Sequence, residues 1–416
     1  MRPVIHIIAA CVITLSIAAC SDSSRHLLAP TRPDLYIPPG GGFPPKYDPT
    51  ANNFVEINSG WWHTCARTKA GAIYCWGSDG FGESGGPATA LCGIWQPLGL
   101  VSCIPQPTRV LSSVFAGGSS ISVGGSHSCA ISSGAVWCWG SNLWAEIGNG
   151  QIGPYASATT PTKVSGADLY AAVGAGGAST CGITTAHQLN CWGNVNGSST
   201  PAMYSINLSW SNNVTLGTSH YCAQSIAGWW GCWGNNDSGQ LSADPAVWPS
   251  LQGPINNPAT NTATRVREGD SFTCADQPNG TILCLGKNDV GQLGTSAFLG
   301  TSTTAVQVVG GGMLLHNVAT GTKHACALDA NGAAFCWGDN TEGKLGVGTS
   351  GGLVRDPMPV LGGLTFRDIS AGQNHTCAIG TDNHLYCWGA NDEGQLGQPS
   401  APLHGQTTPV RAVDAF

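Results

Sequence analysis

Apolar residues along the chain occur in short stretches that Gly or Pro interrupts. No stretch keeps the 3.6-residue apolar spacing of an amphipathic helix. Val, Ile, Thr and Trp are frequent, and glycine contributes 59 residues. Because β-branched and aromatic residues favour strands and Gly favours tight turns, the pattern predicts an all-β fold of short antiparallel strands.

Seven cysteine pairs divide residues 51–416 into repeats. A glycine stands five residues before the first cysteine of every pair, and another stands two residues after the second. Repeats of ~50 residues with several short strands each are typical of propeller blades. The pairs are Cys65 and Cys75, Cys129 and Cys138, Cys181 and Cys191, Cys222 and Cys232, Cys274 and Cys284, Cys326 and Cys336, and Cys377 and Cys387.

The segment between the two cysteines of a pair is predicted to be a β-hairpin. In the second repeat the spacing centres a two-residue turn on Ser133 and Gly134, whereas the other repeats need a loop of three or five residues. Either way the two cysteines face each other, and directly opposed residues lie close enough for a disulfide. Cys92 and Cys103 lie together in an insertion of the first repeat and form an eighth predicted pair.

A zinc site is the alternative for these cysteines, because His63 precedes Cys65 by two residues. Structural zinc needs four ligands at tighter spacing. The histidine is also replaced by Ser179 and Phe272 in two repeats that keep both cysteines. We therefore expect disulfides in an oxidising compartment, with no metal and no cofactor.

The hairpin register places a tryptophan opposite a small residue in five repeats. A large ring facing a small side chain fills the space between blades without overpacking. The fourth repeat departs with Trp233 opposite Tyr221, and the fifth has Leu285 at the tryptophan position. The five expected pairs are Trp76 and Thr64, Trp139 and Ser128, Trp192 and Thr180, Trp337 and Ala325, and Trp388 and Thr376.

The repeats resemble those of the regulator of chromosome condensation family. The resemblance runs from a Gly-x-x-His start to a Trp-Gly-x-Asn-x-x-Gly-Gln-Leu-Gly end, and it is best in 217–241, 321–346 and 372–397. The third repeat lacks the Gly-Gln-Leu-Gly segment. The resemblance covers residues 51–416 and implies a single seven-bladed β-propeller.

The ends of the repeat region suggest how this ring closes. Later repeats are each preceded by a Pro-x-x-Val strand, such as 357–360, but none precedes Phe54. An extra copy at 409–413 follows the last repeat. We therefore expect the ring to be closed by the C-terminal strand, which would complete the first blade and remove an exposed sheet edge.

Residues 1–19 have the features of a lipoprotein signal peptide. Arg2 is followed by an apolar stretch that is shorter than the ~20 residues of a membrane span. Small residues before Cys20 resemble a lipobox, which implies a bacterial lipoprotein with its lipid on Cys20. The alternative is an ordinary signal peptide with a chance cysteine. Residues 20–50 contain seven prolines and a glycine run, and they predict an extended tether.

The lipoprotein resemblance also predicts a location. Ser21, and not Asp, follows Cys20 directly. In lipoproteins of this kind that favours the outer membrane, so we expect a lipid-anchored protein of the cell envelope, at the outer membrane or the cell surface.

Charge and motifs narrow the class of function. The net charge is −7 with 16 Lys and Arg, and the chain has no basic run, which argues against nucleic-acid binding. No Ser/His/Asp arrangement, P-loop or metal spacing is recognisable, so no enzyme is predicted. The repeat histidines are expected to be structural, with ring nitrogens bonded to backbone groups. They are His63, His127, His220, His324 and His375.

Loop tryptophans are the candidate ligand-binding residues, because aromatic residues in loops are enriched at binding hot spots. The alternative is that they cap blade ends. We expect a monomeric scaffold that binds an unknown protein or glycan and touches a membrane only through its lipid. A structural spacer without a ligand is the second hypothesis, and a guanine-nucleotide-exchange-type regulator rests on family analogy alone. The candidates are Trp61, Trp62, Trp144, Trp229 and Trp230.

Overall fold

The structure is a computed structural model. It describes residues 53–95, 99–110, 115, 120–195, 197–205, 208–247, 250–256, 260–297, 300–399 and 405–413. The expected signal peptide, the tether and Cys20 lie outside these residues. Asp48–Phe416 forms one compact unit. No helix within the described residues has the length and apolarity that crossing a membrane requires.

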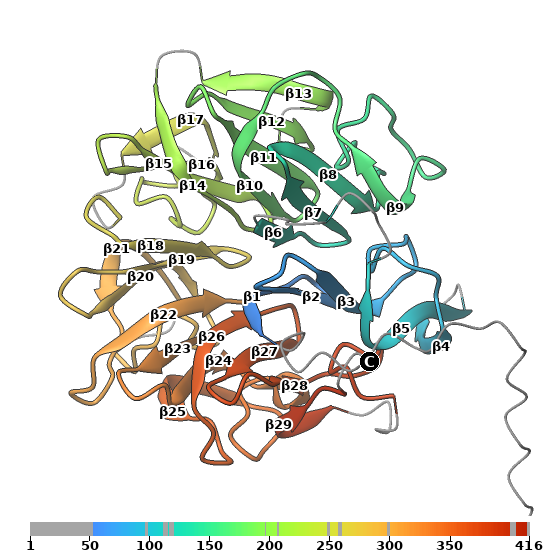
Figure 1. Cartoon of the computed structure of the whole chain (residues 1–416). Helices are drawn as coiled ribbons and strands as arrows, with labels where there is room; N and C mark the ends of the chain where they lie inside the picture. The colour runs from blue at the N-terminus through green and yellow to red at the C-terminus, as the bar shows by residue number, and fades with distance from the viewer. Residues whose placement is uncertain are drawn as a thin grey trace, which may run out of the picture. The chain divides into compact units, whose positions relative to one another are not determined.

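Seven antiparallel sheets, blades 1 to 7, follow one another in chain order around a common axis (Figure 1). The first strands of neighbouring blades contact each other around the whole ring, so they are innermost. We call the four main strands of each blade A to D, from the axis outward. Blade 1 consists of β1 (Phe54–Ser59), β2 (His63–Thr68), β3 (Ile73–Ser78) and β5 (Gly99–Arg109), with β4 (Ala90–Trp95) at its outer edge.

The next three blades each have four strands in the order of the sequence. Blade 2 consists of β6 (Ser120–Val123), β7 (His127–Ser132), β8 (Ala135–Gly140) and β9 (Ala158–Lys163). Blade 3 consists of β10 (Tyr170–Gly176), β11 (Ser179–Thr184), β12 (Leu189–Gly193) and β13 (Ser198–Ser205). Blade 4 consists of β14 (Trp210–Leu216), β15 (His220–Ser225), β16 (Trp230–Asn235) and β17 (Ser250–Asn256).

The last three blades repeat this order, and one 3₁₀ turn, η2 (Thr341–Gly343), lies in blade 6. Blade 5 consists of β18 (Arg265–Glu268), β19 (Phe272–Asp276), β20 (Ile282–Asn288) and β21 (Gly300–Gln307). Blade 6 consists of β22 (Leu315–Thr320), β23 (His324–Asp329), β24 (Ala334–Asp339) and β25 (Leu353–Pro359). Blade 7 consists of β26 (Phe366–Ala371), β27 (His375–Gly380), β28 (Leu385–Gly389) and β29 (Gln406–Arg411).

The seven-bladed all-β fold predicted from the repeats is confirmed, but the predicted closure is wrong. The C-terminal strand β29 pairs with β28 in blade 7, where Cys387 lies opposite Val410. Each Pro-x-x-Val segment therefore belongs to the D strand of the blade before it, and not to the blade after it. Every blade is a continuous stretch of chain, and the ring closes by packing of blade 7 against blade 1.

The B–C hairpins have the predicted register. Cys65 lies opposite Cys75 and Thr64 opposite Trp76, and the same pattern recurs in the other blades. In blade 2 the two-residue turn is Ser133 and Gly134, both with positive φ, which the twist of adjoining strands favours. Eight disulfides join the paired cysteines, including Cys92 with Cys103 across β4 and β5.

Candidate functional site

The ring has two faces, which differ in the loops that reach them. A–B loops and C–D loops lie on one face, and the B–C hairpin turns and the D–A connections lie on the other. We call the first the glycine face, because the first glycine column stands there at the end of every A strand. At Gly124 a Cβ would lie 2.9 Å from the carbonyl oxygen of Gly176 in the next blade, so close backbone approach requires glycine.

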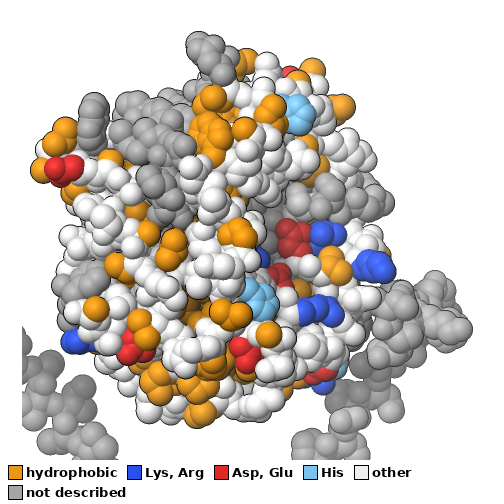
Figure 2. Space-filling model, turned by 90° about the vertical axis from the view of Figure 1, so that its left-hand side faces the viewer, with side chains coloured by type: hydrophobic (Ala, Val, Ile, Leu, Met, Phe, Trp, Pro, Cys, Tyr) orange, Lys and Arg blue, Asp and Glu red, His pale blue; other side chains and the backbone are white. Residues whose placement is uncertain are grey.

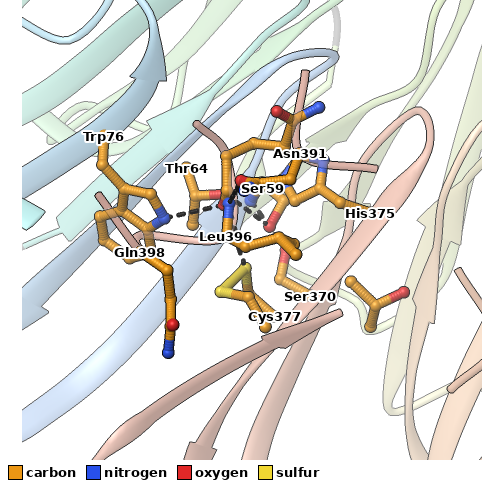
Figure 3. The surroundings of a disulfide bond; sticks show 12 residues. Ser59, Thr64, Trp76, Ser370, His375, Cys377, Asn391, Leu396 and Gln398 are labelled. Carbon is orange, nitrogen blue, oxygen red and sulfur yellow. Dashed lines mark hydrogen bonds between the residues drawn. A yellow bond between two sulfur atoms is a disulfide. The ribbon is translucent and has the colours of Figure 1, made fainter. Parts of the chain in front are cut away.

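The repeat histidines link each blade to the next. Their Nε2 atoms lie 2.7–2.9 Å from a Ser or Thr hydroxyl of the following blade, and not from a backbone group as expected. All five rings are fully buried. Figure 3 shows the pair at the seam of the ring, where His375 of blade 7 meets Thr64 of blade 1. The pairs are His63 and Ser128, His127 and Thr180, His220 and Thr273, His324 and Thr376, and His375 and Thr64.

The hydrogen bonds of the hydroxyls determine the tautomer of these rings. Thr273 donates its hydroxyl hydrogen to the carbonyl of Gln240 at 2.9 Å, so the nearby His220 Nε2 must be the donor. Equivalent hydroxyl-to-carbonyl bonds fix three more of the histidines. Burial lowers the pKa of His220 to about 3, and it lowers the pKa of His127 to about 4. The five rings are therefore neutral at pH 7, and the four with a fixed tautomer act as structural donors.

The five candidate tryptophans do not form one group. Trp61 and Trp62 lie in the A–B loop of blade 1, with ring centroids 5.4 Å apart, and Trp144 lies in the C–D loop of blade 2. These three are on the glycine face. Trp229 and Trp230 lie at the B–C hairpin of blade 4, on the opposite face.

Trp230 is a core residue, so the prediction that it binds a ligand from a loop is wrong. It is only 2% exposed, and its Nε1 donates to the carbonyl of Ala263 at 3.0 Å. Trp229 is partly buried and packs beside Trp210, with ring centroids 6.0 Å apart. The two adjacent residues differ because successive side chains of a strand point to opposite faces of the sheet.

Large apolar side chains gather on the glycine face over blades 1 and 2. We call Trp61, Trp62, Phe81, Leu143 and Trp144 the aromatic sector. Phe81 is 42% exposed, Leu143 is 43% and Trp144 is 53%. Trp61 also bonds across the blade boundary, from its backbone N–H to the carbonyl of Gly125. Phe81 and Leu143 were not predicted from the sequence.

The equivalent loops of blades 4 to 7 are more polar. The positions that correspond to Phe81 and Trp144 hold Ser238, Val290, Glu342 and Glu393, and those that correspond to Leu143 hold Asp237, Asp289, Thr341 and Asp392. This difference between repeats is the sequence signal that would have found Phe81 and Leu143. Figure 2 shows one side of the molecule, on which hydrophobic groups form patches and several of the charged groups lie beside a hollow.

The ring axis holds a second candidate site. The A strands of all seven blades line a cavity of about 480 Å³. It narrows toward the glycine face, where the glycines surround a space of about 80 Å³. Arg265, Arg267, Glu56 and Glu268 are its charged lining residues. Among the described residues no three His, Cys, Asp or Glu side chains gather in a way that could hold a metal.

Models of known families match part of the repeat region. Two family models described as "Regulator of chromosome condensation (RCC1) repeat" match the chain. One matches residues 54–83, 316–344 and 366–395, and the other matches residues 331–379 and 382–413. These segments lie in blades 1, 6 and 7.

Curated relatives match the propeller at low identity. The ultraviolet-B receptor UVR8 of Arabidopsis thaliana is 28% identical over 304 residues, which are 67% of this chain and 66% of the receptor. The human E3 ubiquitin-protein ligase HERC2 is 26% identical over 348 residues, 82% of this chain but 6% of the ligase. The aligned region thus covers only part of each of these relatives.

Solved structures share the fold. Prp20p of Saccharomyces cerevisiae, described with its binding to Gsp1p and histones, superposes with a TM-score of 0.69 at 17% identity, covering 87% of this chain and 88% of that one. Human WBSCR16 has a TM-score of 0.69 at 18% identity, with 82% and 94% covered. At these identities the likeness shows the fold alone.

Proposed function

We propose that this propeller with RCC1-type repeats is a binding module outside the cytoplasm, anchored by lipid on Cys20, that recognises a protein through its aromatic sector. The observation that carries the proposal is the concentration of exposed large apolar side chains in the glycine-face loops of blades 1 and 2, where Phe81, Leu143 and Trp144 lie. In the described C–D loops of blades 4 to 7, Val247 is the one large apolar residue that is equally exposed. Trp, Tyr and Arg are the residues most enriched at binding hot spots, and this face presents Trp61, Trp62 and Trp144. The eight disulfides support an oxidising compartment.

Chain direction supports the use of this face. The chain enters the ring at Phe54, where β1 begins on the hairpin face, opposite to the aromatic sector. The chain therefore joins the propeller at the face opposite to the proposed binding surface. A protein partner is favoured over a glycan because the yeast neighbour of the same fold is described with protein partners. Catalysis forms no part of the proposal.

The test compares two pairs of substitutions of exposed apolar residues. The full chain, folded under oxidising conditions, is used to capture partners from envelope extract. The Phe81→Ser and Trp144→Ser variant should lose at least about 10-fold of captured partner, since a hot-spot aromatic residue contributes about 2 kcal/mol or more. The matched control, Ile226→Ser with Leu314→Ser, changes two residues of the hairpin face that are 63% and 60% exposed, and it should bind like wild type.

Each of the other outcomes supports a different hypothesis. Equal capture by both variants would reject the aromatic sector, and loss in the control alone would move binding to the hairpin face. If the partner is recovered on a glycan panel and not among proteins, the ligand class is wrong. Capture of nothing by wild type would favour the spacer hypothesis.

A further inference from the structure

The channel-facing residues of the A strands form a layer of seven, one from each blade. Each stands two positions before the glycine that ends its A strand. Six of the seven are small or neutral, and only blade 5 contributes a charge. We call this set the inner layer. It consists of Asn58, Ser122, Gly174, Thr215, Arg267, Ala319 and Ser370, and all of these except Gly174 line the axial cavity.

Arg267 keeps most of its hydrogen-bonding capacity unused. Its Nη1 donates to the carbonyl of Val266 in its own strand at 2.9 Å, and within the described residues no further bond of this side chain is found. A guanidinium has five N–H donors in a planar fork. Burial lowers the pKa of Arg267 to about 10, so the group remains charged at neutral pH.

The carboxylates near the channel are already engaged by other groups. Glu56 pairs with Arg67 at 2.8 Å, and Glu268 accepts from the Thr215 hydroxyl at 2.7 Å. Asp368 accepts from the side chain of Asn317 at 3.2 Å. None of the three forms an ion pair with Arg267 in the described part of the chain.

Two serines of the inner layer can add donors to the guanidinium. Ser122 Oγ accepts the backbone N–H of Ala175 at 2.8 Å, and Ser370 Oγ accepts that of Ser59 at 2.9 Å. A hydroxyl that accepts a hydrogen bond still has its own hydrogen to donate. Both residues line the same cavity as Arg267.

We propose that the axial channel is an anion site in which Arg267, assisted by Ser122 and Ser370, binds the carboxylate or phosphate group of a small ligand. A cavity of about 480 Å³ is within the range of small-molecule sites. The planar guanidinium fork matches both oxyanions in bidentate geometry. Ala319 of the inner layer also lines the cavity and places only a small side chain there. The site is separate from the aromatic sector and does not depend on the function proposed for it.

The test is isothermal titration of the full chain, folded with its disulfides, in low-salt buffer. The probes are inorganic phosphate and galacturonate, with galactose as the uncharged counterpart. Wild type should bind at least one anion saturably and should not bind galactose. Arg267→Gln should weaken that binding by about 10-fold or more, because a charge-assisted bidentate pair is lost. Arg267→Lys keeps the positive charge but lacks the planar guanidinium. Its affinity for the anion should lie between those of wild type and Arg267→Gln.

Controls separate this site from other effects. Arg355→Gln makes the same chemical change at an exposed arginine of β25 and should leave binding unchanged. The Phe81→Ser and Trp144→Ser variant should also bind the anion as wild type does, which keeps the two proposals independent. If Arg267→Gln fails to melt cooperatively, Arg267→Lys carries the comparison. Absence of saturable binding to both anions, or equal binding by wild type and the Arg267 variant, overturns the proposal.

Discussion

Two neighbouring blade interfaces of the ring are packed with different residues at equivalent positions. Between blades 4 and 5, His220 donates to Thr273, as in most of the ring. Between blades 5 and 6 the corresponding residues are Phe272 and Ala325, both fully buried. A polar pair is thus replaced by an apolar pair, so neither Phe272 nor Ala325 presents a buried polar group that needs a partner. The two positions change together because they meet across one interface.

The large ring at these interfaces can come from either blade. At six interfaces the following blade contributes the buried tryptophan, as Trp337 does between blades 5 and 6. Blade 5 has Leu285 at that position. Between blades 4 and 5 the tryptophan is instead Trp230 of the preceding blade, at a position where the other blades have aliphatic residues. Total volume across the interface is preserved, which is what a close-packed core requires.

Of the substitutions that test this comparison of interfaces, Trp230→Ala should destabilise the protein most. Removing a fully buried tryptophan leaves a cavity, and the expected loss is about 3–5 kcal/mol in the free energy of unfolding. Guanidinium denaturation under oxidising conditions measures it. Trp229→Ala is the control, since its partly buried ring should cost clearly less. Equal losses in the two variants would contradict the core role of Trp230.

A smaller effect is expected from pH. Burial holds the pKa of His220 at about 3 in the folded chain, whereas the unfolded side chain has a pKa of about 6.5. Between pH 7 and pH 5 the unfolded state binds a proton that the folded state does not, so stability falls as pH falls. His220→Phe with Thr273→Ala copies the apolar interface and removes this site. Between pH 7 and pH 5, the free energy of unfolding of this double variant should fall by about 2 kcal/mol less than that of wild type.

Denaturant unfolding of both proteins at the two pH values checks this prediction. The acidic residues with raised pKa values, such as Glu83 and Glu146, are common to both proteins and cancel in the difference. An identical pH dependence would show that His220 does not titrate differently in the two states.

The smallest effect is a coupling between blades 5 and 6. Phe272→His alone places a polar ring opposite Ala325, which has no hydroxyl to accept its hydrogen bond, and should cost about 1–3 kcal/mol. Adding Ala325→Thr restores the pair found elsewhere and should recover about 1–2 kcal/mol. A double-mutant cycle on unfolding free energies measures the coupling. Additive losses would mean that the two positions do not pair.

The repeat pattern was sufficient to predict the blades but not their boundaries. Cysteine and glycine columns fix the hairpin register, because opposed cysteines and Trp-to-small pairs follow from spacing within one hairpin. A periodic sequence does not say where its unit begins, and the Pro-x-x-Val strand was therefore assigned to the wrong blade. The histidine partners were missed for a related reason. His220 and Thr273 lie 53 residues apart and meet only when consecutive blades pack together.

The candidate binding residues were only partly predictable from residue type. Trp61, Trp62 and Trp144 lie on one face with Phe81, but residue type alone could not separate Trp229 from Trp230. Their difference arises from strand alternation and from the missing tryptophan at Leu285 in the next blade. Arg267 was not singled out at all, because its environment is formed by A strands from seven distant segments.

Because every blade is a continuous stretch of chain, the seam between blades 7 and 1 has the same kind of contacts as the other six boundaries. His375 meets Thr64 there, and Trp76 donates to the carbonyl of Gln395 at 2.9 Å (Figure 3). Blades 7 and 1 thus pack together without a chain connection between them, as the other neighbouring blades do with one. Circular permutation should therefore be able to move the chain ends to another D–A connection without dividing a sheet. Whole blades should likewise be exchangeable between related rings as intact units.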